Sequence, residues 1–113
     1  MKYSDEQRLH KIYEKGNMLL EYIRDHDVKK DDLMNDTALQ WLVTTPLSNI
    51  GEHAYYISDE YKVKHPEIQW NMIAGLRHRL VHDYDGTNWF IIADVVFDEL
   101  PVLVKQVKGL ISA

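Results

Sequence analysis

Apolar residues recur along most of this 113-residue chain at intervals of three and four, the spacing of helices that bury one face. The spacing predicts helices over residues 5–26, 31–44, 46–58, 66–84 and 88–110, with room for a further helical turn in the charged connection 59–65. No segment alternates with a period of two for long enough to form a strand. The expected fold is therefore all-α, an up-and-down bundle of four to five helices in a single domain spanning residues 1–113.

Local signals set the expected ends of these helices. A capping box that begins at Ser4 should open the first helix. Pro46 is poorly accommodated inside a helix, so we expect Thr45 to cap a new helix that begins there. Thr87 can cap the last helix, which Pro101 should kink without ending, because the apolar stripe resumes in register. In the second helix the residues expected to face inward are Met34, Ala38, Trp41 and Leu42.

Composition narrows the possible functions. The chain has no Cys, which excludes a disulfide framework, a thiol nucleophile and a Cys-ligated metal site. We see no signal region and no apolar run as long as a membrane span, so we expect a soluble, cytoplasmic protein. A net charge of −5 argues against a general nucleic-acid binder. Residues 61–82 are the exception, because this stretch contains four basic residues and three His but only one acidic residue.

The candidate site lies in this basic stretch and has the pattern Arg77-x4-His82-x-Tyr84. Helical spacing places Arg77 on the side of Trp70 and Ala74, beside the apolar stripe rather than opposite it. A guanidinium is rarely buried without a partner, so its position at an apolar seam indicates an interface or a cleft.

Arg77, His82 and Tyr84, in this order and spacing, resemble the signature of HepT-like proteins, a branch of the HEPN superfamily. The likeness covers roughly residues 30–110. Flanking segments that resemble the family are Ile50-Gly51-Glu52, Pro66-Glu67-Ile68 with Trp70, and Leu100-Pro101. The chain departs from the family pattern at His53, Gln69 and His78.

This resemblance implies a metal-independent endoribonuclease toxin that needs no cofactor and forms a homodimer through the motif helix. Arg77 and His82 would be catalytic, and Arg79 and His78 would contact RNA phosphates. Tyr84 would be the site where a partner antitoxin, a minimal nucleotidyltransferase, transfers AMP and silences the toxin. Five residues along a helix turn by roughly 140° and rise by about 7.5 Å, so Arg77 and His82 of one helix do not converge on one phosphate. Two copies related by a two-fold axis would bring them together.

Other interpretations of the same residues stay open. The chain could be a non-catalytic HEPN module that only docks with, or is modified by, a nucleotidyltransferase. Arg77 could simply pair with Glu52, while His82 caps the helix end. His78 and His82 lie one turn apart and could ligate zinc, with Asp85 or His53 as a third ligand. We expect the three tryptophans to be core or dimer contacts, namely Trp41, Trp70 and Trp89.

Overall fold

The structure is a computed structural model, and it describes residues 2–81 and 86–112. These residues form helices joined by short connections and contain no strand, which confirms the all-α prediction. The elements in chain order are α1 (Asp5–Asp25), α2 (Lys30–Asn35), α3 (Thr37–Tyr56), α4 (Asp59–Lys64), α5 (Trp70–Ala74), α6 (Leu76–Val81), α7 (Trp89–Asp94), the π-helical segment η1 (Val95–Glu99) and α8 (Leu100–Ile111).

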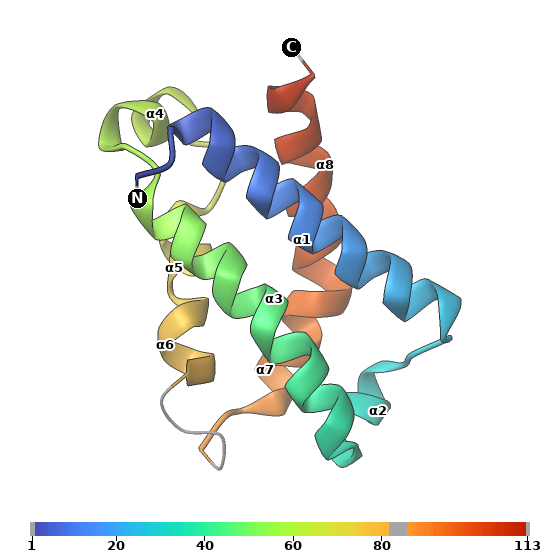
Figure 1. Cartoon of the computed structure of the whole chain (residues 1–113). Helices are drawn as coiled ribbons and strands as arrows, with labels where there is room; N and C mark the ends of the chain where they lie inside the picture. The colour runs from blue at the N-terminus through green and yellow to red at the C-terminus, as the bar shows by residue number, and fades with distance from the viewer. Residues whose placement is uncertain (1, 82–85, 113) are drawn as a thin grey trace.

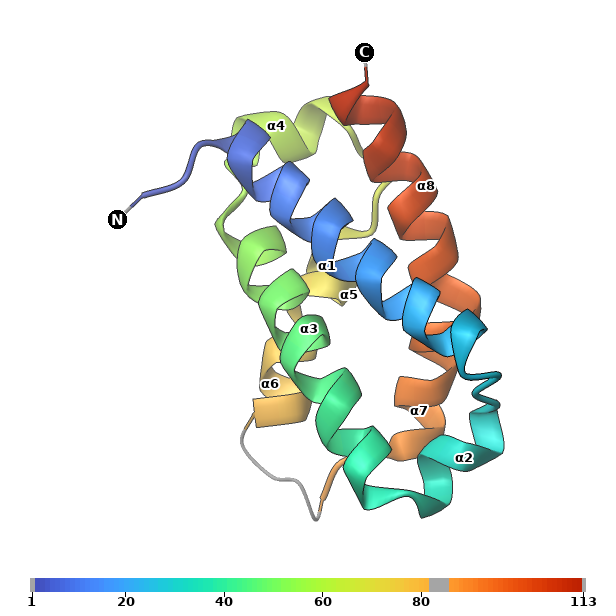
Figure 2. The same ribbon diagram turned by 45° about the vertical axis from the view of Figure 1, so that its right-hand side comes forward.

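The long elements alternate in direction, as predicted for an up-and-down bundle (Figure 1). Helix α1 packs against α3 and α8, and α3 in turn packs against α5 and α6 (Figure 2). Each of these elements contributes to one core, whose fully buried members include Ile12, Val43, Leu47, Ile50, Leu80, Ile92, Val96 and Val107. Within the part of the chain that the structure describes, no helix combines the length and apolar character needed to cross a bilayer.

The first helix begins as the sequence predicts. Ser4 Oγ accepts a hydrogen bond from Gln7 N at 3.1 Å, and Gln7 Oε1 accepts one from Ser4 N at 2.8 Å, which completes the capping box. The carboxylate of Asp5 accepts two further bonds, from Ser58 N at 2.9 Å and Ser58 Oγ at 2.6 Å. These bonds hold the start of α1 beside the end of α3.

The predicted break at Pro46 is wrong. The chain breaks at Asp36, whose carboxylate caps α3 by accepting from Leu39 N at 3.1 Å, and α3 then continues through Pro46 to Tyr56. Full burial of residues on both sides of Pro46 offsets the hydrogen bond that proline removes. Because the break at Asp36 separates α2 from α3, the predicted inward face does not run through both helices. Trp41 and Leu42 therefore face solvent instead of the core, with Trp41 64% exposed.

The motif helix also differs from its predicted bounds. Residues 66–69 form turns that bury Ile68, and helix α5 begins only at Trp70. The Trp70 indole donates to His65 O at 2.9 Å, which fixes this start. Gly75 then interrupts the helix, so the described part of the predicted motif helix forms two short helices, α5 and α6, rather than one. These two helices, residues 70–81, are called the motif segment.

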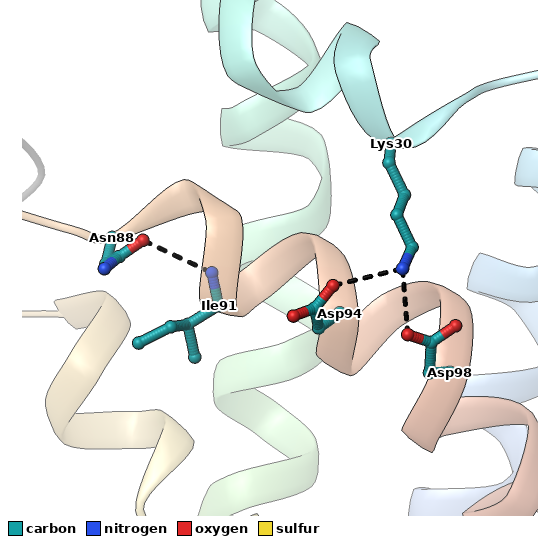
Figure 3. A network of polar contacts seen from close by, with 5 residues as sticks. All are labelled: Lys30, Asn88, Ile91, Asp94 and Asp98. Atoms are coloured by element: carbon teal, nitrogen blue, oxygen red, sulfur yellow. Dashed lines mark hydrogen bonds and ion pairs between the residues drawn. The ribbon is translucent and has the colours of Figure 1, made fainter.

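The last helical stretch, formed by α7, η1 and α8 in succession, begins at a different capping residue from the predicted one. Asn88, not Thr87, caps α7 by accepting from Ile91 N at 3.3 Å (Figure 3). The helix continues across Pro101, as predicted, and the irregularity lies one turn earlier as the π-helical η1. Lys30 of α2 bridges this region, because its Nζ donates to Asp98 at 2.8 Å and to Asp94 at 3.1 Å (Figure 3). The bonds to Asp98 and Asp94 raise the pKa of Lys30.

Gly51 of α3 sets the depth at which the motif segment docks. A Cβ at this position would lie 3.0 Å from Arg77 N and 3.1 Å from Ile73 O. Both of these atoms are backbone, so they cannot rotate away as a flexible side chain could. A Cβ would therefore force this backbone to shift by a few tenths of an ångström, so glycine allows the start of α6 to approach α3 this closely without strain.

We therefore predict that Gly51→Ala lowers the free energy of unfolding by about 1–3 kcal/mol, because the added methyl group forces the motif segment away from α3. Chemical denaturation measures this change. Gly109→Ala is the matched control, since a Cβ there meets nothing within 4 Å, and it should leave stability unchanged or raise it by about 0.5–1 kcal/mol. Equal effects of the two substitutions would contradict the assigned close contact.

Candidate functional site

Arg77, on the first turn of α6, projects onto the C-terminal half of α3. Its guanidinium carbon Cζ lies over the Tyr55 ring at 3.6 Å from the ring centre. The Nη1 atom of Arg77 lies 3.7 Å from Oε1 of Glu52, which precedes Tyr55 by one turn of α3. The aromatic ring and the carboxylate together orient the side chain, which keeps 20% of its surface in contact with solvent.

The Arg77 guanidinium is oriented without being fully paired. A separation of 3.7 Å from Glu52 is too long for a strong hydrogen bond, and the Glu52 side chain is itself 51% exposed. Arg77 Nε is buried and has no hydrogen-bond partner among the described residues. A fixed cation whose donors are not all used is what binding of an anion requires.

A second cation faces the same pair of tyrosines. The rings of Tyr55 and Tyr56 meet edge to face at 4.9 Å, and Tyr56 is 51% exposed. Arg8 of α1 places its Cζ 5.0 Å from the centre of the Tyr56 ring, while Arg77 Cζ lies 5.9 Å from that same centre. Two arginines that are far apart in the sequence therefore flank one aromatic pair.

His53 lies beside Arg8. It is buried, and its Nδ1 lies 3.2 Å from Arg8 Nη1. A guanidinium can only donate, so Nδ1 must accept this hydrogen bond. Nδ1 therefore carries no proton and the imidazole is neutral. Burial lowers the pKa of His53, and the positive charges of Arg8 and Lys11 lower it further. Glu52 opposes this effect and Lys15 adds to it.

Of the other motif residues, the structure describes Arg79 and His78. Arg79 lies on a different side of α6 from Arg77 and lines an apolar groove of about 210 Å³ beside η1 and α8, together with Met72 and Asp98. His78 is exposed. His82 and Tyr84, as well as Asp83 and Asp85, lie outside the described residues, so the structure does not place them relative to Arg77.

Metal ligation finds no support in the part of the chain that the structure describes. In residues 2–81 and 86–112, no group of three or more His, Asp or Glu side chains is arranged to hold a metal ion. The zinc hypothesis for His78 and His82 stays a prediction, because His82 lies outside these ranges. Of the tryptophans, Trp70 is a core residue, Trp89 is half-buried and Trp41 is exposed.

The sequence model of the HepT-like ribonuclease family matches residues 12–110. The match covers α3, the motif segment and almost all of α8, and hence both sides of the site around Arg77. This chain belongs to the HepT-like family.

Named relatives agree with this assignment. One, from Caldanaerobacter subterraneus subsp. tengcongensis, is 32% identical over 92% of this chain and 91% of its own length. Another, from Methanocaldococcus jannaschii, is 29% identical over 88% of this chain and 90% of its own length. A third, from Thermococcus cleftensis, is 31% identical over 97% of this chain and 98% of its own length. All three are named as candidate ribonucleases, the last as HepT. No solved structure matches the chain significantly.

The lowered pKa of His53 predicts a loss of stability in acid. His in the unfolded chain takes up a proton near pH 6.5, whereas His53 in the HepT-like fold stays neutral to lower pH. Between these two pKa values the unfolded state binds more protons, so the free energy of unfolding should fall as the pH drops below about 6.5. Urea titrations over this pH range measure the slope.

His53→Gln retains an acceptor for Arg8 and should flatten this dependence. The matched control is His10→Gln, which removes an exposed imidazole on α1 and should keep the wild-type slope. If His53→Gln follows the same curve as the wild-type chain, burial of a neutral His53 is not the cause.

Proposed function

We propose that this HepT-like chain is a metal-independent endoribonuclease, the toxin of a toxin–antitoxin pair, in which Arg77 binds the scissile phosphate. The observation that carries the proposal is the Arg77 side chain, held over Tyr55 at 3.6 Å, while its terminal Nη1 has only a loose contact with Glu52 at 3.7 Å among the described residues. Membership of a ribonuclease family supports an RNA phosphate as the anion.

Arg77 and His82 would divide the reaction between them. A ribose 2′-oxygen attacks the phosphorus and the bond to the 5′-oxygen breaks, leaving a 2′,3′-cyclic phosphate and a 5′-hydroxyl. His82 would take the proton from the attacking 2′-hydroxyl and pass it to the departing 5′-oxygen, since an imidazole titrates near neutral pH. Arg77 would stabilise the extra negative charge of the transition state with its guanidinium donors. These steps require no metal.

A homodimer would complete the site. Helical spacing from Arg77 to His82 would separate them by roughly 140° of rotation in one chain, so each site would draw Arg77 from one protomer and His82 from its partner. Tyr84 would lie near this cleft. A nucleotidyltransferase antitoxin would transfer AMP from ATP to its hydroxyl, breaking the bond between the α- and β-phosphates and releasing pyrophosphate. The added AMP would bring bulk and negative charge, and both would exclude RNA.

We predict that purified protein cleaves single-stranded RNA in the presence of EDTA. Arg77→Lys should lower kcat by about 10²-fold, because an ammonium cannot reproduce the planar fork of donors, and His82→Ala should abolish cleavage. Cleavage rates and end-group analysis of the products measure this. Unfolding and refolding Arg77→Ala and His82→Ala chains together should restore activity, since a mixed dimer contains one intact composite site.

Arg24→Lys is the matched control, because Arg24 lies in the last turn of α1 and its side chain is 73% exposed. It should cleave like the wild-type chain. An active His82→Ala variant, or a mixture that stays inactive when both single variants are folded dimers, would contradict the assigned roles. Absence of RNA cleavage under every condition would instead favour a non-catalytic module that only docks with a nucleotidyltransferase.

We predict that a minimal nucleotidyltransferase of the antitoxin class, supplied with ATP, adds AMP to Tyr84 and stops RNA cleavage. Tyr84→Phe lacks the acceptor oxygen and should remain unmodified and active. Intact-mass spectrometry and the RNA assay together test this. Modification of Tyr84→Phe to the wild-type extent would show that another hydroxyl is the acceptor, and exposed Tyr55 and Tyr56 serve as internal references.

A further inference from the structure

A second basic pocket lies next to Arg77, where the start of α1 meets the end of α3. It has a volume of about 680 Å³ and is lined by Lys2, Tyr3, Arg8, Asn49, Glu52, His53 and Tyr56. Glu52 and Tyr56 also contact or face Arg77, so this pocket and the Arg77 site share two residues and form one continuous surface.

Neutral groups alone hold Arg8 in the pocket. Its Cζ lies 5.0 Å from the centre of the Tyr56 ring and 5.4 Å from that of Tyr3. Its Nη1 donates to the neutral His53 at 3.2 Å. No carboxylate pairs with Arg8 among the residues that the structure places. Its charge is therefore positioned but not neutralised, which favours binding of an anion.

The surroundings of Arg8 suit a nucleic-acid strand better than an isolated anion. The half-exposed Tyr56 ring offers a face on which a base can stack, and such stacking accepts any base. Arg8 and Arg77 both lie near this ring, at 5.0 Å and 5.9 Å from its centre. Two cations beside one half-exposed aromatic ring can contact neighbouring phosphates of single-stranded RNA while a base contacts the ring.

We propose that Arg8 and Tyr56 form a second RNA subsite, which binds the phosphate and base of the nucleotide next to the one held by Arg77. The proposal rests on the proposed ribonuclease function, because the strand in the second subsite is the substrate of the first. Arg8 binds the neighbouring phosphate, Tyr56 stacks on the base, and His53 keeps the Arg8 guanidinium in place. This subsite retains the RNA strand and leaves the reaction itself to Arg77 and His82.

The test measures binding separately from cleavage. A fluorescent single-stranded RNA of about ten nucleotides, 2′-O-methylated so that it cannot be cleaved, is titrated with the full chain at several salt concentrations. Arg8→Gln should weaken binding about tenfold and reduce the slope of log Kd against log salt by about 0.7, the loss of one phosphate contact on a single strand. Tyr56→Ala should also weaken binding about tenfold, whereas Tyr56→Phe keeps the ring and should bind like the wild-type chain.

Arg24→Gln is the matched control, since it removes the same charge from the opposite end of α1. It should change neither the affinity nor the salt slope. Circular dichroism confirms that each variant folds, and Arg8→Lys, which retains the charge, should recover most of the salt slope even if Arg8→Gln is poorly folded.

The outcomes separate this proposal from the one on which it rests. If the wild-type chain cleaves RNA but Arg8→Gln and Tyr56→Ala bind the uncleavable strand normally, the second subsite is refuted and the ribonuclease stands. If these two variants instead lose only binding to a nucleotidyltransferase, the pocket is a protein-docking surface and the subsite is refuted as well. If the wild-type chain neither binds nor cleaves RNA, both proposals fail.

Discussion

The contact between α3 and the motif segment is the constraint on which the rest of the site depends. Gly51 lets the backbone of Arg77 approach α3 so closely that a Cβ there would lie 3.0 Å from the Arg77 nitrogen. The Arg77 side chain extends along the surface of α3 and meets Tyr55 and Glu52 there. The close approach at Gly51 thus brings the start of α6 within reach of these two residues.

Sequence patterns predicted the fold where one apolar stripe dominates, as in α1 and in the helical stretch formed by α7, η1 and α8. They failed where local and tertiary preferences compete. Pro46 is a helix breaker by local rules, yet the fully buried Val43 and Leu47 keep α3 continuous across it. The carboxylate of Asp36, which sets the real break, can be recognised as a cap only once the start of α3 is known. Likewise, periodicity alone does not separate a π-helical turn such as η1 from a proline kink.

The site was only partly visible in the sequence. The position of Arg77 beside the apolar stripe indicated a seam, and the structure places it at the junction of α6 and α3. Tyr55, Tyr56 and Arg8 were not singled out, because their contacts join segments that are more than twenty residues apart, and helical spacing carries no information on such pairs. The one available signal was the pair of adjacent tyrosines that begins two residues after the Ile50-Gly51-Glu52 segment. From the sequence, His53 was considered only as a possible third zinc ligand, because its partner Arg8 lies far away on α1.

The position of Tyr55 has a consequence for sequence preference. The ring covers one face of the Arg77 guanidinium, and Nε is buried, so a ligand reaches mainly the terminal nitrogens. A planar base cannot stack on a face that is already covered, whereas two oxygens of a phosphodiester can approach the terminal nitrogens in their plane. A strand bound in this way would be held by its backbone, which is identical in every nucleotide. Any discrimination between RNA targets would then have to come from the shape of the strand or from contacts elsewhere.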